Sequence, residues 1–288
     1  MDNFQITKKQ HYVPEFLLKN FCSSDGKFAA YNIQYKSYSR KSPAQVCYKD
    51  FLYETRNNND EFILCNEIEK YFSEKEKEYS DCINDVLWKT QYPYYLTHEI
   101  CTINEIETLY SFAANLIVRN PYTMNLSDCS DLVDDIKKSK EYAKISALLK
   151  RCDLGSADNI LQAAFQRYFL DDRNESGTAA LFIDEIKKLN FLIWISPNNQ
   201  FVTSTFPIAI DFFEDKAFRK IIIPLSPHCT VLFHEHETNN VVRLINDEQV
   251  IEINKLISNV AMQGRDFLFA KDKKAIEELI QFIGEKNE

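Results

Sequence analysis

The stretch Phe191–Ser204, FLIWISPNNQFVTS, marks the point at which the chain changes from helical to extended patterning. Its first and last parts are short apolar runs, and the residues between them, Pro197–Gln200, form a polar turn sequence. Short apolar runs bounded by turn residues are typical of β-strands. We therefore predict two strands here, at the start of a β-rich region that covers about residues 190–270.

The sequence after this stretch continues the strand pattern and then alternates with helices. Residues 219–235, RKIIIPLSPHCTVLFHE, contain two strands around the PLSP turn, and residues 239–246 and 266–270 predict shorter ones. Between them, Val250, Ile253, Ile257 and Val260 recur at helical spacing. The same spacing predicts a helix over residues 272–286.

The sequence before the stretch is mostly helical. Ile68, Phe72, Tyr79 and Ile83 give residues 66–90 an apolar helical stripe, and we interpret the SEKEKE run within them as a solvent-facing surface. Helical patterns also cover residues 127–152, 156–170 and 178–190.

Local signals set the limits of other elements. Thr102 and Glu105 form a capping box that begins a helix, and the sequence Asn120-Pro121 ends it. Near the start, the alternating segment Lys27–Arg40 predicts a β-hairpin. The chain is therefore expected to be α+β, with a helical middle at about 60–190, an N-terminal hairpin and a C-terminal antiparallel or mixed sheet, in a single domain of residues 1–288.

Composition excludes several functional classes. The 288 residues include only five glycines, which are too dispersed for a P-loop or a dinucleotide fingerprint. The formal net charge of −9 disfavours non-specific binding to nucleic acid or to anionic membranes. No apolar run approaches the roughly 20 residues that span a bilayer. The eight cysteines form no CxxC pair, and the polar N-terminus indicates a cytoplasmic protein with reduced thiols.

The segment Gln10–Phe21, QHYVPEFLLKNF, contains the first candidate site residues. His11 and Tyr12 stand just before Pro14, which suits the first turn of a helix. His11 could serve as a general acid or base or contact a phosphate, because its pKa lies near neutrality. The alternative is that it hydrogen-bonds a neighbouring loop and fixes the start of the chain.

Two further candidates lie where predicted elements end. Arg119 ends an apolar helix, where a cation is favourable in itself, although a bidentate contact to phosphate or carboxylate is the functional alternative. Thr203, Ser204 and Thr205 end a strand and could line a ligand pocket, or could instead satisfy the backbone of a turn. No G-x-S-x-G motif accompanies Ser204, which disfavours a hydrolase triad.

The sequence HEHE at residues 234–237 is a weaker candidate for a metal site. His234 and His236 would share one face of a strand and could both ligate a metal ion. No third ligand is evident nearby, and two ligands rarely make a tight site. The sequence indicates no particular cofactor.

An ordered series of motifs covers nearly the whole chain. It comprises the HYVP box, DGKFAAYNI, KDFLYE, the helix ending VRNP, FVTSTFP, PLSP and the late EINKLISNVA. This series resembles the DUF4238 family, a bacterial group of unknown function. The family pattern is similar to HHYVPQFYLRNF at the start, an Arg-x-Pro helix end and a later TSDNP box. The resemblance implies a shared fold and no established reaction.

The chain departs from that pattern at two places. Gln10 stands where the family often has a histidine, and Thr205 and Phe206 stand where it has Asp and Asn. The second departure removes an acid that could bind a metal or act as a base. If the family has metal-dependent chemistry there, the resemblance implies that this chain has lost it.

Three functional hypotheses follow. The first is a binding or sensing module for a phosphate-bearing ligand or a protein partner, built on His11, Arg119 and Thr203, in phage defence or stress. The second is a metal-dependent nuclease or other phosphodiester hydrolase, with His11 as acid or base and Arg119 stabilising developing charge. The third is a structural partner that docks through residues 137–149, with homo-oligomer formation among the outcomes.

Overall fold

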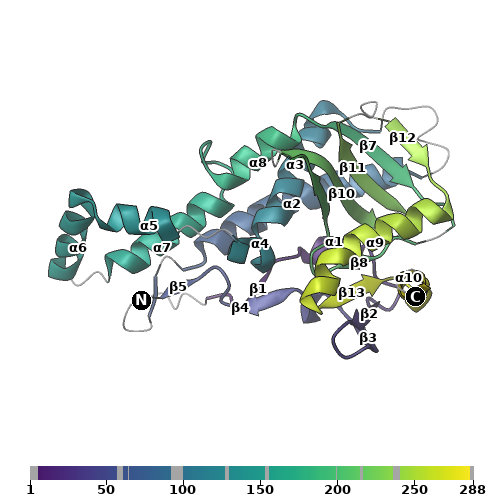
Figure 1. Ribbon diagram of the computed structural model, residues 1–288, viewed down its shortest axis with the longest axis horizontal. Helices are drawn as coiled ribbons and strands as arrows, with labels where there is room; N and C mark the ends of the chain where they lie inside the picture. The colour runs from purple at the N-terminus through teal and green to yellow at the C-terminus, as the bar shows by residue number, and fades with distance from the viewer. Residues whose placement is uncertain are drawn as a thin grey trace.

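The computed structural model contains two main sheets and a set of helices that cover them (Figure 1). It describes residues 6–56, 61–63, 65–91, 100–126, 130–152, 156–198, 200–214, 217–235 and 241–285. The α+β class is confirmed, because a run of helices over residues 67–186 separates the N-terminal strands from the C-terminal ones.

The larger sheet has five strands in the order β12-β7-β11-β10-β9. It is mixed, because β12 runs parallel to β7 while the other pairs are antiparallel. The strands are β7 (Asn190–Ile195), β9 (Ala209–Phe212), β10 (Phe218–Ser226), β11 (Cys229–His234) and β12 (Val241–Leu244).

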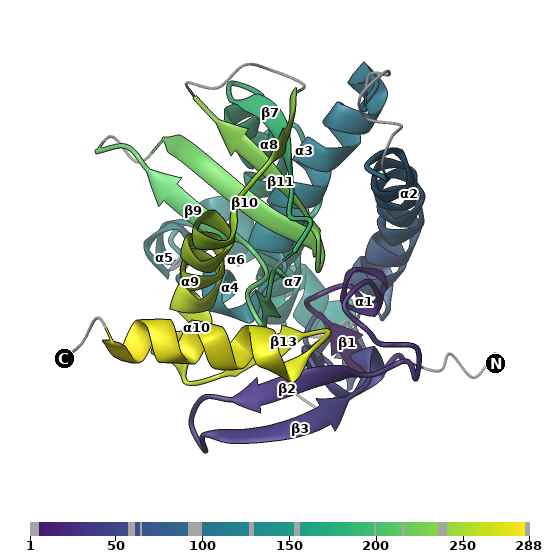
Figure 2. The same ribbon diagram turned by 90° about the vertical axis from the view of Figure 1, so that its right-hand side faces the viewer.

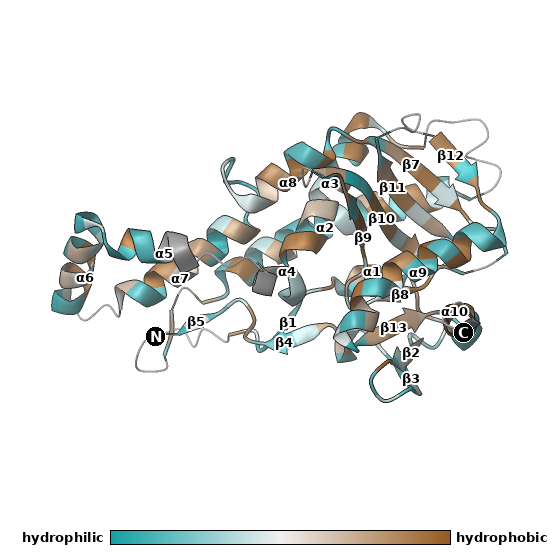
Figure 3. Cartoon of the chain, viewed as in Figure 1, coloured by the Kyte–Doolittle hydropathy of each residue, from teal (hydrophilic) through white to brown (hydrophobic). Residues whose placement is uncertain are grey.

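Helices cover both faces of this sheet, which explains why its central strands are largely apolar (Figures 2 and 3). On one face, Phe191 and Ile193 join the core formed with α3 (Ile103–Val118). On the other face, Leu192 packs with Ile253 and other residues of α9 (Asp247–Gly264).

The smaller sheet has four strands in the order β3-β2-β13-β8. The predicted hairpin is confirmed as β2 (Phe28–Asn32) and β3 (Ser37–Lys41), and it joins the C-terminal strand β13 (Phe267–Ala270). The fourth strand is β8 (Thr203–Ser204). The two strands predicted in the stretch 191–204 therefore belong to different sheets, since β7 lies in the larger one.

The remaining strands are short, and one of them leads into the predicted start of a helix. β1 (Lys9–His11) pairs with β4 (Tyr48–Asp50), and β5 (Thr55–Arg56) pairs with β6 (Phe62–Ile63). Pro14 stands immediately before α1 (Glu15–Lys19), as expected for a residue whose missing N–H would lack a helical partner.

The other helices follow the predicted stripes. α2 (Glu67–Lys89) buries Ile68, Phe72, Tyr79 and Ile83, and the capping box of Thr102 begins α3. The helices that complete the fold are η1 (Pro43–Gln45), α4 (Pro121–Leu126), α5 (Ser130–Lys137), α6 (Lys140–Cys152), α7 (Ala157–Leu170), α8 (Thr178–Ile186) and α10 (Lys273–Glu285). In Figure 1, α5, α6 and the start of α7 extend away from the two sheets.

Gly177, the N-cap of α8, is in a place where no larger residue fits. A Cβ atom added there would lie 2.6 Å from the carbonyl oxygen of Tyr168 and 3.0 Å from that of Asn174. Both obstacles are backbone atoms, which cannot turn aside as a flexible side chain would.

We predict that Gly177→Ala lowers the free energy of unfolding by about 1–3 kcal/mol, because the new methyl group forces the backbone apart. The matched control is Gly264→Ala at the end of α9, where a Cβ would meet nothing within 4 Å. Urea denaturation of both variants checks this, and equal stabilities would contradict it.

Candidate functional site

Two of the predicted site residues line one polar cleft. The α1–α2 cleft, as we call it, has a volume of about 390 Å³ and lies where β1, α1, α2 and the end of α3 meet. Its lining residues are His11, Glu15, Phe16, Lys19, Glu69, Phe72, Ser73, Glu76, Lys77 and Arg119. His11 and Arg119 are thus brought together across 108 positions of sequence.

His11 ends β1, opposite Tyr48 of β4, and its ring lies 5.5 Å from the Tyr48 ring between centroids. Its Nε2 atom is 3.5 Å from Oε1 of Glu15, four residues along the chain. In the part of the chain that the structure describes, this nitrogen is buried and has no hydrogen-bond partner. Burial lowers the pKa of His11, while the nearby carboxylates of Glu15 and Glu76 act in the opposite direction.

The Arg119 side chain is 1% exposed and is engaged on several sides. Its Nη1 donates to Oε1 of Glu76 at 2.8 Å, and its Nη2 donates to the backbone carbonyl of His11. The guanidinium also lies over the ring of Phe72, 4.3 Å from the centroid. A bidentate contact with a phosphate would have to displace Glu76, so these contacts favour the structural interpretation of Arg119.

Two acids of the cleft were not identified from the sequence. Glu69 and Glu76 lie seven residues apart on α2 and therefore share a face. Glu76 falls within the SEKEKE run, which we had interpreted as a solvent-facing surface. The available signal was its position four residues after Phe72, on the edge of the apolar stripe.

Glu69 has unusual electrostatics for a carboxylate. It makes no ion pair with a lysine, arginine or histidine among the described residues. Burial raises the pKa of Glu69 to about 7, an effect that Arg119 opposes and that Glu76 and Glu54 reinforce. A titratable group so perturbed inside a cleft is a candidate functional residue.

Gln10 hydrogen-bonds Tyr53 and Glu54 behind the cleft. Its side chain donates to Oε1 of Glu54 at 2.7 Å and accepts from the backbone N–H of Tyr53 at 2.7 Å. Glu54 in turn accepts from the backbone N–H of Asn66, just before α2. The residue that departs from the family's histidine thus has a structural role in this chain.

The hydroxyl residues lie apart from the α1–α2 cleft. Thr203 and Ser204 are fully buried in β8, and the Ser204 hydroxyl donates to the carbonyl oxygens of Phe206 and Ile257 at 2.7 and 3.2 Å. These contacts favour the structural interpretation of Ser204. Thr205 instead lines a neighbouring cavity.

This second cavity, which we call the Thr205 cavity, has a volume of about 180 Å³. Tyr12 lines it, whereas its neighbour His11 lines the α1–α2 cleft. Asn120 lines it too, next to Arg119, and its Nδ2 donates to the Thr205 carbonyl at 2.8 Å. The remaining lining residues are Lys49, Pro121, Tyr122, Phe206, Val260, Ala261, Gly264 and Asp266.

The other predicted site lies elsewhere. His234 ends β11, and His236 lies outside the described residues, so the proposed pair of metal ligands stays a prediction. Across the described ranges there is no group of three or more His, Cys, Asp or Glu side chains that could hold a metal ion.

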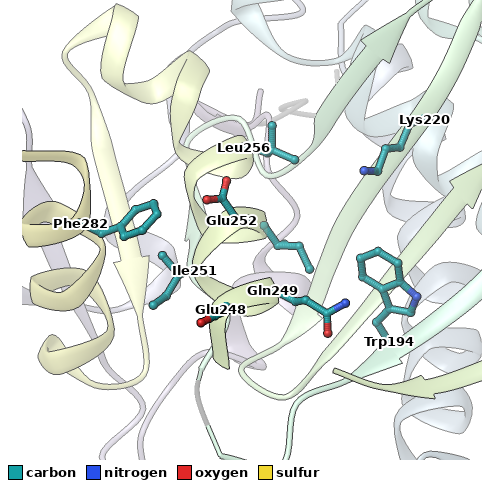
Figure 4. Close-up of a pocket in the computed structure, with 9 residues that line it drawn as sticks. Trp194, Lys220, Glu248, Gln249, Ile251, Glu252, Leu256 and Phe282 are labelled. Atoms are coloured by element: carbon teal, nitrogen blue, oxygen red, sulfur yellow. The ribbon is translucent and has the colours of Figure 1, made fainter. Parts of the chain in front are cut away.

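A wider cavity of about 490 Å³ contains none of the predicted site residues (Figure 4). It lies along α9, with Trp194 and Lys220 of the larger sheet on one side and Phe282 of α10 on the other. Glu248 and Glu252 of α9 also line it.

Comparison with known proteins identifies the family. A family model described as a protein of unknown function (DUF4238) matches residues 9–274. The chain therefore belongs to this family, as the series of motifs indicated. No curated protein and no solved structure matches it.

We predict that Arg119→Met destabilises the protein by about 3–5 kcal/mol, because it leaves the Glu76 carboxylate and the His11 carbonyl without their donor. Arg40→Met is the matched control, since Arg40 pairs with Asp25 at 2.6 Å and both side chains are about half exposed, and an ion pair in water contributes little to stability. Chemical denaturation measures both, and similar losses would show that the buried position of Arg119 is unimportant.

We also predict an effect of Glu69 on stability that depends on pH. Its pKa in the folded protein, about 7, lies above its ordinary value of 4.5, so between these values the folded state binds more protons than the unfolded state. Stability from this group therefore falls as the pH rises through that window. Glu69→Gln should raise the melting temperature relative to the unaltered protein at pH 8 and have less effect at pH 5. The control is Glu74→Gln, an exposed position on the same helix; a difference that does not vary with pH would contradict the prediction.

Proposed function

We propose that this protein is a binding module and that its ligand enters the α1–α2 cleft with a cationic group directed at Glu69. The supporting observation is the carboxylate of Glu69, which is half-buried in the cleft and makes no ion pair within the described part of the chain. Charged groups that are removed from water are normally paired. A ligand cation would supply the missing partner.

The other acidic groups of the cleft already have partners. Arg119 neutralises Glu76 at 2.8 Å, and Glu15 lies 3.5 Å from His11 and 3.8 Å from Lys19. Glu69 is thus the acidic group left to attract a ligand. The rings of Phe16 and Phe72 add apolar surface beside it, and the organic part of a ligand cation could pack against such surface.

A phosphate-bearing ligand is less well supported by the same contacts. Both terminal nitrogens of Arg119 are used within the protein, and three carboxylates would face the phosphate. The basic groups that remain are His11, Lys19 and Lys77. Lys19 and Lys77 are exposed and flexible, which makes them weak fixed donors.

Acid–base catalysis is a second candidate, and the pKa values in the cleft favour it. His11 has a lowered pKa, and Glu69 has a pKa of about 7. Two such groups in one cleft can divide the roles of proton acceptor and proton donor near neutral pH. In phosphodiester hydrolysis, one would take a proton from the attacking water molecule and the other would protonate the leaving oxygen.

The biological setting stays a prediction. The proposal also includes a role in phage defence or stress, a cytoplasmic location, a protein partner and a homo-oligomer. These parts rest on the sequence and not on a contact in the structure. None of the described helices has the length and the apolarity to span a bilayer. On α6, Ile145 and Leu148 are exposed within the segment 137–149 that we predicted to dock a partner.

We predict that ethylammonium, a minimal organic cation, binds about tenfold more tightly at pH 8 than at pH 6, because Glu69 is mostly ionised at the higher pH and mostly protonated at the lower. Burial lowers the pKa of His11 and so moves its titration towards the acid side of this pH range. NMR titration gives the affinities, and Glu69→Gln should abolish the pH dependence while Glu74→Gln preserves it.

Inorganic phosphate is the opposing probe in the same titration. If phosphate binds more tightly at pH 6 and Glu69→Gln does not change the affinity for ethylammonium, the ligand of the cleft is an anion rather than a cation. For the catalytic candidate, the protein is incubated with RNA and DNA with and without Mg²⁺. Cleavage that is lost in both His11→Gln and Glu69→Gln supports catalysis, and absence of cleavage by the folded protein removes it.

A further inference from the structure

We propose that the Thr205 cavity is a second binding site and that it takes an ammonium group, held by the Asp266 carboxylate among three aromatic rings. The proposal is independent of the function proposed for the α1–α2 cleft, because different side chains carry it. The shared chemistry is a primary ammonium, which a free amine or the side chain of a lysine could provide.

The composition of the cavity carries this inference. Tyr12, Tyr122 and Phe206 give it aromatic walls, and the Tyr122 and Phe206 rings lie 5.8 Å apart between centroids. Asp266 is the one carboxylate among the lining residues. Aromatic faces attract cations through their quadrupole, and a carboxylate beside them adds a charged partner. This combination suits an ammonium ion better than an anion or a neutral sugar.

Asp266 has no cationic partner of its own in the described part of the chain. Burial raises its pKa, while hydrogen bonds from the Thr205 hydroxyl and the Phe267 backbone N–H act in the opposite direction. Thr205 stands at the position where the family pattern has an acid. Asp266, which is distant in the sequence, nevertheless places a carboxylate beside Thr205 in the fold.

Two backbone positions beside the cavity lie in the left-handed region. Arg265, the residue before Asp266, ends α9 in the left-handed region with φ of 53°. Cys47 has φ of 54°, and its carbonyl accepts the backbone N–H of Tyr12 at 2.9 Å. Non-glycine residues in this region cost free energy and cluster at functional sites.

Asn120 links Thr205 and Tyr122, two other residues that line the cavity. Its Nδ2 donates to the Thr205 carbonyl, and its Oδ1 accepts the backbone N–H of Tyr122 at 3.0 Å. The Tyr122 side chain is 42% exposed, so it borders the opening of the cavity. The volume of about 180 Å³ has room for roughly six water molecules. That space suits the end of an amine and excludes a nucleotide.

Lys49 is the cation of this chain that competes for the site. It lines the cavity and is close enough to lower the pKa of Asp266, but it forms no ion pair with it. Its exposed position on β4 leaves the carboxylate open to a ligand. The variant Lys49→Gln, which lacks this charge, therefore shows whether Lys49 or a ligand occupies the cavity.

The test uses NMR titration of the full chain with methylammonium and with the tripeptide Gly-Lys-Gly. We expect Asp266→Asn to weaken binding at least tenfold and Tyr122→Leu, an exposed change that should preserve folding, to weaken it several-fold. The control Asp272→Asn, outside the cavity, and Glu69→Gln in the other cleft should leave unchanged the affinity that is read from the Tyr122 and Asp266 resonances. Binding of methylammonium alone identifies a free amine, and tighter binding of the tripeptide identifies a lysine side chain.

Several outcomes would overturn the proposal. No shift of Tyr122 or Asp266 resonances at saturating methylammonium would exclude the site, as would equal affinity in folded Asp266→Asn. Binding that occurs only in Lys49→Gln would show that Lys49 itself occupies the cavity. Loss of binding in Glu69→Gln, with Asp266→Asn unaffected, would assign the probe to the α1–α2 cleft instead.

Discussion

The buried guanidinium of Arg119 is the contact on which the arrangement of the candidate sites depends. It joins the end of α3 to the carboxylate of Glu76 on α2 and to the carbonyl of His11 at the end of β1. Tyr53 completes the joint by donating its hydroxyl to the Arg119 carbonyl at 3.2 Å. The carboxylate of Glu76, the His11 carbonyl and the Phe72 ring compensate for the burial of this charge, and the segments that carry them give the cleft its shape.

A second constraint comes from α9, which serves both sheets. Its residues Val250, Ile253 and Ile257 pack on the larger sheet, and Ala261 packs with the smaller sheet and α10. Polar contacts follow the same division, because Asn254 accepts the backbone N–H of Val202 at 2.9 Å just before β8. The position of β8, and with it that of Thr205, is therefore set by a helix whose main hydrophobic contacts lie in the other sheet.

Local sequence patterns predicted the helices and strands well, but they did not predict which distant segments lie together. The stripe on α2, the capping box of Thr102 and the hairpin after Lys27 depend on neighbours within a few residues, which the sequence displays directly. The separation of β7 and β8 into two sheets depends on packing against α9, which no local pattern records. Glu69 and Asp266 were not identified from the sequence for the same reason. Each resembles an exposed acid in its local sequence, and only distant segments bury it. His11 and Arg119 were found because histidine and arginine are conspicuous beside proline and at a helix end.

The α1–α2 cleft and the Thr205 cavity share a partition only one chain thick. His11 faces one side and Tyr12 the other, and Arg119 and Asn120 divide in the same way. At the end of β1, adjacent side chains point in opposite directions, and Arg119 and Asn120 diverge at the end of α3. A displacement of the backbone at either place therefore alters both compartments together. The two compartments are thus coupled in shape through a shared backbone, even though different side chains line them.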